Sequence, residues 1–164
     1  MKTTLLGAAV LCALAIAASP ALAFDPIISI AGQVPVIHPG GGTQQLLATG
    51  AQTGGQFSAI VDVQKAGSDT GGPMIHAKET EIWYVVEGSY EFNIGGKAVQ
   101  GGPGTLIAVD AGQPHSFKAK TDGKLLMIWT PGGFEQFFMD WDKQGKAFGP
   151  DIGAQAASYG VTWP

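Results

Sequence analysis

Short runs typical of β-strands, each ended by a glycine turn, fill most of the chain and set the strongest constraint on its fold. The predicted strands cover residues 45–49, 56–64, 82–87, 90–94, 97–100, 106–109, 115–119 and 125–130. Gly95 and Gly96 stand between two of these strands and predict a two-residue hairpin, because both tolerate positive φ. Regular short strands without a long helical period are typical of an antiparallel sandwich or barrel. We therefore expect an all-β fold.

The segment GGPMIHAKETEIWYVVEG, residues 71–88, holds a histidine and a carboxylate beside a strand that the pattern predicts to be buried. Side chains two apart on a strand share a face, so Glu81, Trp83 and Val85 point one way and the residues between them the other. Both faces are apolar after Glu81, which is typical of a strand covered on both sides. A buried carboxylate is costly without a partner, so we expect Glu81 to find one in a cavity that His76 also faces.

A second segment, residues 102–117, offers that partner. It contains a short apolar strand at 106–109, a turn marked by Gly112 and Pro114, and then His115 at the start of the next strand. The turn thus places a second histidine where a strand begins, and in the first segment Glu81 also stands where a strand begins. We therefore expect the two segments to meet.

Together the two segments resemble the two motifs of the cupin superfamily. The run EIWYVVEG from Glu81 is similar to the family's ExxYVLEG strand, GPGT from Gly102 to its GPGD turn, and GQPHSF from Gly112 to its GxPHxF turn. Segments 48–58 and 130–138 resemble those that flank the barrel in small single-domain cupins of the quercetin-dioxygenase-like type (cupin type-2), so the resemblance covers about residues 44–163. It implies a small antiparallel β-barrel, or jelly roll, which carries many unrelated activities.

The resemblance also implies a ligand set. Cupins usually offer two histidines two residues apart, then a glutamate, then a late histidine. Without a gap, these positions fall on Met74, His76, Glu81 and His115, so Met74 replaces the first histidine. A shifted alignment would make His76 the first histidine and Lys78 the missing second, but we prefer the ungapped one. Two imidazoles and one carboxylate suit a divalent transition metal, Fe, Mn, Ni or Zn, with positions left open for substrate.

Two functions remain open on these observations. The first is a metal-dependent enzyme of the oxygenase or oxidoreductase type, acting on a small organic molecule that the resemblance implies to be aromatic. The second is a non-catalytic binding protein with a degenerate metal site, in which the histidines and Glu81 satisfy each other. In both, apolar side chains wall the cavity, and no catalytic residue beyond the metal ligands is predicted. The predicted wall consists of Val61, Met74, Trp83, Val85, Phe117, Met127 and Trp129.

Residues 1–23 have the three parts of a secretory signal peptide. Lys2 supplies a positive start, residues 5–18 are apolar, and a small-x-small site ends at Ala23, after which we expect cleavage. The alternatives are an uncleaved anchor and a lipoprotein site at Cys12, which the large Leu11 before it disfavours. The mature protein would then be periplasmic or secreted and would contain no cysteine.

The charge excludes some partners. The chain has a net charge of −4 and no arginine, so it lacks the basic runs that bind a nucleic-acid backbone. We expect a small-molecule ligand or substrate, no nucleic acid, and no membrane after signal cleavage. A homodimer is implied by the resemblance only.

Three parts follow the signal peptide. Residues 24–43 are expected to form an extended N-terminal arm, 44–130 the cupin barrel, and 131–164 a C-terminal helical segment that packs on the barrel. Four aromatic side chains in this last segment fall on one helical face: Phe134, Phe137, Phe138 and Trp141. We expect them to pack against the outside of the barrel, with a pocket or a dimer contact as the alternatives. A second short helix is expected from Asp151. The histidine of the arm, His38, and the charges of Lys78, Glu79 and Glu87 are expected to be solvated.

Overall fold

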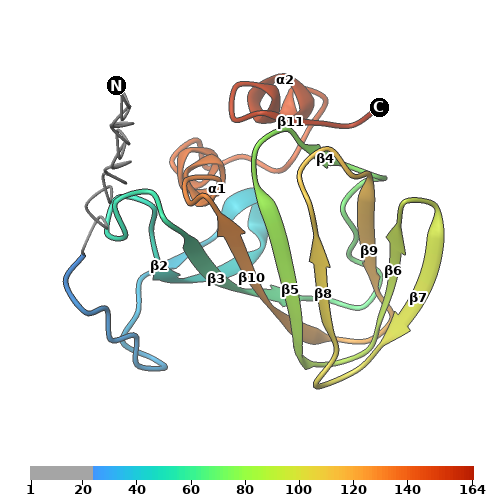
Figure 1. The fold of residues 1–164 in the computed structure, drawn as a ribbon, viewed down its shortest axis with the longest axis horizontal. Helices are drawn as coiled ribbons and strands as arrows, with labels where there is room; N and C mark the ends of the chain where they lie inside the picture. Colours follow the sequence, from blue (N-terminus) through green and yellow to red (C-terminus); the bar gives the residue numbers. More distant parts are fainter. Residues whose placement is uncertain (1–23) are drawn as a thin grey trace, which may run out of the picture.

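The computed structural model describes residues 24–164, and the predicted signal peptide, residues 1–23, lies outside this range. Two antiparallel sheets form the walls of a barrel, and a smaller third sheet lies at one end, beside the two helices (Figure 1). The predicted all-β class and the antiparallel barrel are therefore confirmed. Among the described residues, no helix is both long and apolar enough to cross a membrane.

The larger sheet has six strands and forms most of the barrel wall. Its order is β1 (Val36–Ile37), β2 (Thr43–Ala48), β3 (Ser58–Gln64), β10 (Gly123–Thr130), β5 (Thr80–Glu87) and β8 (Leu106–Val109). The second sheet has the order β7 (Lys97–Gly101), β6 (Tyr90–Ile94) and β9 (His115–Ala119). The third sheet pairs β4 (Ile75–His76) with β11 (Val161–Thr162).

Alternation along β5 and β10 decides which side chains enter the barrel. Glu81 pairs with Trp129, and Trp83 pairs with Met127, so these side chains lie on the same face of neighbouring strands. All four are buried, with at most 4% of the side chain exposed. The register therefore places the carboxylate on the inner face, as the sequence predicts.

On β3 the alternation runs opposite to our expectation. Ile60 pairs with Met127 and Asp62 with Leu125, so the inner face of β3 carries Ile60 and Asp62. Val61 lies on the outer face, and its predicted place in the cavity wall is wrong. A carboxylate that looks solvent-facing in the sequence is thus inside the barrel.

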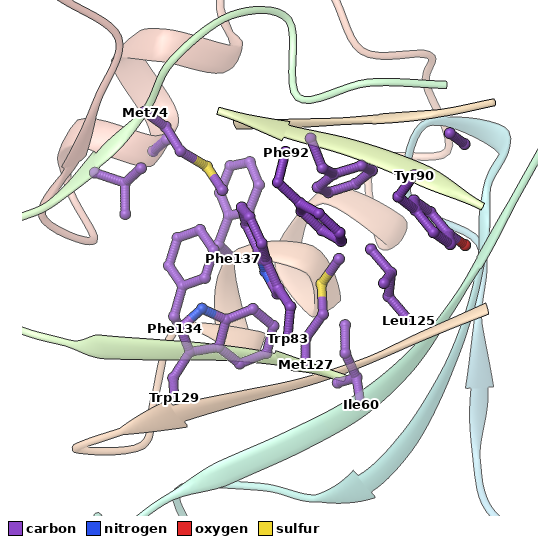
Figure 2. Packing of buried hydrophobic residues seen from close by; sticks show 14 of the residues in the cluster. Ile60, Met74, Trp83, Tyr90, Phe92, Leu125, Met127, Trp129, Phe134 and Phe137 are labelled. Atoms are coloured by element: carbon purple, nitrogen blue, oxygen red, sulfur yellow. The ribbon is translucent and has the colours of Figure 1, made fainter. Parts of the chain in front are cut away.

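Aromatic side chains fill one end of the barrel. Trp83 stacks on Phe92 with ring centroids 5.5 Å apart and meets Phe117 edge-on at 5.4 Å. Tyr90 and Leu125 complete this cluster, and both are fully buried (Figure 2). Burial of these large apolar surfaces is the main stabilising term of the fold.

The predicted hairpin connects β6 and β7. Ile94 pairs directly with Lys97 across the turn. Gly95 and Gly96 have φ of 56° and 84°, the left-handed region that a two-residue hairpin requires. A side chain at either position would be strained.

The ends of the described chain meet the barrel in different ways. In the arm, β1 extends the large sheet, and a short 3₁₀ helix, η1 (Pro39–Gly41), follows it. His38 is exposed, as expected, and its backbone N–H donates to Asp142 at 2.7 Å. After the barrel come α1 (Glu135–Asp142) and α2 (Ile152–Ala157). The backbone N–H of Gly50 donates to Glu135 at 2.8 Å, which ties the start of α1 to the loop after β2.

Candidate metal centre

His76, Glu81 and His115 converge from three different strands, β4, β5 and β9. Each is 1% exposed, and their ligand atoms all lie within 4.8 Å of one another. Glu81 Oε2 is at the centre, 2.9 Å from His115 Nε2 and 3.2 Å from His76 Nε2. The structure thus brings together the three residues that the two sequence segments offered.

Backbone hydrogen bonds between the two segments explain why the histidines meet. Met74 N–H donates to the carbonyl of His115 at 2.8 Å, and His115 N–H donates back to Met74 at 2.9 Å. Gly112 N–H donates to the carbonyl of His76 at 2.8 Å. These bonds join the start of β9 to β4, so both imidazoles lie beside the beginning of β5.

Neighbouring groups orient two of the three ligands. Trp83 Nε1–H donates to Glu81 Oε1 at 2.7 Å, which leaves Oε2 directed at the imidazoles. His115 Nδ1 lies 2.7 Å from the carbonyl of Gln113. Because a carbonyl only accepts, Nδ1 carries the proton of this bond and Nε2 faces the centre. Hydrogen bonds of this kind fix ligand orientation in metal sites.

His76 has a carboxylate behind it. Its Nδ1 is 3.5 Å from Glu79 Oε2, and Glu79 is 9% exposed. Our expectation that Glu79 is a solvated turn charge is therefore wrong, whereas Lys78 is exposed. Neither ring nitrogen of His76 makes an aligned hydrogen bond, although Nε2 is close to Glu81. This imidazole is buried with unused hydrogen-bonding capacity at both ring nitrogens.

Opposite charges dominate the electrostatics of the centre. Burial by itself raises the pKa of Glu81, but the hydrogen bond from His115 and the close positive charge of His76 outweigh it and lower that pKa to about 2. Burial lowers the pKa of His76, but Glu79 and Glu81 outweigh it and raise that pKa to about 9. Without an ion, Glu81 is therefore charged and His76 protonated at neutral pH. The carboxylates of Glu79 and Glu81 that stabilise the proton on His76 would also stabilise a metal cation bound in its place.

The donor set and its spacing fit a divalent transition metal. Ligands about 2.1 Å from an ion and at right angles to each other lie about 3 Å apart. The two contacts of Glu81 Oε2, at 2.9 and 3.2 Å, match that spacing. Two imidazoles and a carboxylate are typical ligands of such ions. The buried, unpartnered nitrogens of His76 are a further sign that a partner fits here.

A cavity of about 840 Å³, a size typical of small-molecule sites, lies beside the centre. Glu81 lies on its wall. Of the predicted wall residues, four line it: Met74, Phe117, Met127 and Trp129. Trp83 and Val85 lie in the core and are fully buried.

The aromatic face of α1 also lines this cavity, so the expectation that it packs outside the barrel is wrong. Phe134, Phe137 and Phe138 all contribute to the wall. Phe134 meets Trp129 at 5.4 Å and lies edge-on to the His76 ring at 4.5 Å. The C-terminal segment therefore forms an apolar cover next to the candidate centre, and Figure 2 shows Phe134 beside Trp129.

Comparison with known families agrees with this geometry. Residues 60–131 match the family model described as "Cupin domain". The chain contains a cupin domain. The match begins at β3 and ends just after β10, so it includes all three candidate ligands. No curated protein matches the chain.

Solved cupin structures share the fold at low sequence identity. An RmlC-like cupin from Shewanella frigidimarina is 21% identical over 66% of this chain and 93% of its own, with a TM-score of 0.56. KdgF from Halomonas sp. is 19% identical over 70% and 97%, with a TM-score of 0.54. Pac13, a nucleoside dehydratase, is 15% identical over 68% and 88%, with a TM-score of 0.54. These similarities establish the fold of the cupin domain and no particular activity.

Two contacts of the cupin site were missed in the sequence, for different reasons. The bond from Trp83 to Glu81 joins residues two apart on one strand face, so alternation already placed them together. The approach of Phe134 to His76 joins residues far apart in the chain, and no local pattern marks it. Met74 occupies the position of the missing histidine, lines the cavity and is 8% exposed.

Proposed function

We propose that this cupin protein holds one divalent transition metal at His76, Glu81 and His115 and acts on a small organic molecule in the adjoining cavity. The observation that carries the proposal is the convergence of three buried donor groups, one of which, Glu81, lies on the wall of a largely apolar cavity. Two imidazoles and a carboxylate form a donor set that divalent transition metals favour, and this set leaves positions on the ion open for substrate.

The residues of the chain have separate tasks in this proposal. A bound ion would polarise a substrate oxygen and, if it is iron, would also supply oxygen chemistry. Trp83 holds Glu81 in position, and the Gln113 carbonyl holds His115. Phe134 and Trp129 exclude water from the side of the cavity where substrate would meet the centre.

We propose an aromatic substrate and an oxygenase or oxidoreductase type of reaction. Phe117, Trp129 and Phe134 support the substrate class, because aromatic walls favour a flat apolar ligand. The reaction type rests on the resemblance to quercetin-dioxygenase-like cupins. A structural neighbour has been described with uridine, which supports a small-molecule ligand in this fold. We also propose export, on the pattern of residues 1–23, and a homodimer.

A non-catalytic binding protein is the second candidate, and one observation favours it. The charge of Glu81 is compensated by the two nearby histidines, so the centre is stable as an ion pair without metal. Met74 replaces a ligand with a thioether, which hard divalent ions bind poorly. In this case the cavity would hold an organic ligand and leave it unchanged.

Metal content distinguishes the two. We would purify the untagged protein without chelators and measure its metals by elemental analysis, with His115→Ala as the test variant and His38→Ala as the matched control. His38 is exposed and is the one histidine of the chain outside the centre. We expect near one equivalent in the wild type and in His38→Ala, and loss in His115→Ala. Absence of metal after incubation with each ion would end the metalloenzyme proposal.

A further inference from the structure

A second polar group lies on the cavity wall, away from the metal centre. It consists of Gln44 on β2 and of Asp62 and Gln64 on β3, and we name it the Asp62 cluster. Gln44 and Asp62 are direct partners across the two strands. They are only 4% and 8% exposed, so this is a buried group and not part of the surface.

The Asp62 cluster has acceptors that nothing in the described chain fills. Gln64 Nε2 donates to Asp62 Oδ2, and the Gln44 amide also hydrogen-bonds this carboxylate. A carboxylate has about four acceptor sites, so some of its capacity remains. Gln44 Oε1 is buried and has no hydrogen-bond partner at all. Buried acceptors of this kind normally have a donor.

No cation of the described residues supplies that donor. Lys65 lines the same cavity, but its ammonium group pairs with Asp122 at 2.8 Å. Burial raises the pKa of Asp62 to about 6, so the carboxylate is still ionised at neutral pH and accepts hydrogen bonds only. A buried charge without a countercharge is costly to fold around. An incoming ligand with donor groups would offset this cost.

We propose that the Asp62 cluster is a second binding subsite, which takes a hydroxyl or ammonium group of the small molecule whose other end reaches the metal centre. The spanning part rests on the proposed function, whereas the subsite does not. On β10, the partner of Asp62 is Leu125 and the partner of Glu81 is Trp129. Four residues of strand span about 13 Å. The ligand is therefore elongated, with an apolar middle and a hydrogen-bond donor at the end far from the metal.

Simple aromatic probes test the subsite. We would titrate hydroquinone, its dimethyl ether and tyramine into the protein and follow binding by ligand-observed NMR. Hydroquinone offers hydroxyl donors, tyramine an ammonium, and the ether no donor. A hydrogen bond to a charged group changes binding by about tenfold or more. We expect one donor probe, or both, to bind at least tenfold more tightly than the ether, and the preferred probe tells a hydroxyl from an ammonium ligand.

Two variants and one control locate the effect. Asp62→Asn and Gln44→Met each remove acceptors and should abolish or reduce the preference for donors, and Gln44→Met carries the test if Asp62→Asn does not fold. Asp69→Asn is the control. Asp69 lines the same cavity but is exposed, and its substitution removes the same charge as Asp62→Asn does. Equal binding of all three probes, or a preference unchanged in both test variants, would overturn the proposal.

Metal analysis of the same samples separates this outcome from the proposed function. Asp62→Asn should keep the metal content of the wild type. One outcome is a wild type that contains no metal and still prefers donor probes, with that preference lost in Asp62→Asn. This result would support the subsite and would contradict only the claim that the other end of the ligand reaches a metal. A metal-bound wild type without any donor preference overturns the subsite and leaves the proposed function standing.

Discussion

The buried aspartate of the cavity wall makes stability depend on pH in a way that one substitution isolates. Burial raises the pKa of Asp62 from 3.8 to about 6, although hydrogen bonds from Gln64 and Gln44 oppose it. A pKa that is higher in the folded state means that the folded protein binds this proton more tightly than the unfolded chain does. The contribution of the protonated Asp62 to the stability of the fold is therefore complete below about pH 4, and it is lost as the pH rises through about 6 and the carboxyl group ionises.

The size of the effect follows from the shift. One pKa unit corresponds to about 1.4 kcal/mol, so the ionised Asp62 costs the folded state up to about 3 kcal/mol at neutral pH. Asparagine keeps the shape of the side chain and has no charge to bury. We therefore expect Asp62→Asn to raise the free energy of unfolding by up to about 3 kcal/mol near pH 8 and to change it little near pH 4.

Urea unfolding at a series of pH values, followed by tryptophan fluorescence, measures this difference. Asp122→Asn is the control of opposite sign, because a hydrogen bond from Lys65 lowers the pKa of the exposed Asp122. That variant should lose stability at neutral pH, and its difference from the wild type should shrink as the pH falls. A difference for Asp62→Asn that is the same at every pH, or that favours the wild type more strongly towards neutral pH, would refute the reasoning.

Four further predictions concern the metal centre and the start of the mature chain. Met74→His should strengthen zinc or nickel binding about tenfold or more by adding a ligand, as competition with a chelating dye would measure. Trp83→Phe removes the donor that holds Glu81 and should weaken binding about 10- to 100-fold in the same assay. Because an ion must displace the His76 proton, whose pKa is about 9, apparent affinity should rise about tenfold per pH unit up to that value, as calorimetric titration would show. Sequencing the exported protein should give Phe24 as its first residue.

Each of these has a result that would count against it. Trp129→Phe is the matched control for Trp83→Phe, because Trp129 lines the cavity but its Nε1 has no hydrogen-bond partner. Equal losses of affinity in the two variants would mean that packing alone is responsible. Unchanged affinity in Met74→His would show that position 74 cannot reach the ion. Affinity independent of pH would contradict the protonated His76, and an N-terminus still at Met1 would contradict cleavage.

Local pattern was sufficient for the parts of the fold that repeat over one or two residues. Alternation put Glu81 and Trp83 on the buried face of β5, and the glycine pair located the hairpin after β6. The same rule failed on β3, where Val61 and Asp62 take the opposite faces from those their polarity suggests. The barrel interior accepts this carboxylate because Gln44 and Gln64 hydrogen-bond it, and that depends on a neighbouring strand.

The candidate site was predictable only where a motif marks it. His76, Glu81 and His115 stand in two recognisable segments, whereas the groups around them come from elsewhere in the chain. Phe134 reaches His76 through the packing of α1, and Glu79 is buried because the turn after β4 folds back on the imidazole. Contacts of this kind depend on tertiary packing, which no spacing in the sequence encodes.

The pairing of β4 with β11 sets an order of events during synthesis. Val161 lies opposite His76 in this two-stranded sheet, and Ala77 N–H donates to the carbonyl of Gly160 at 2.8 Å. The strand that carries His76 therefore lacks its partner until residues near 161 have left the ribosome. This wall of the candidate centre is therefore completed last, and the proposed ion would be fully held only after β11 has paired with β4.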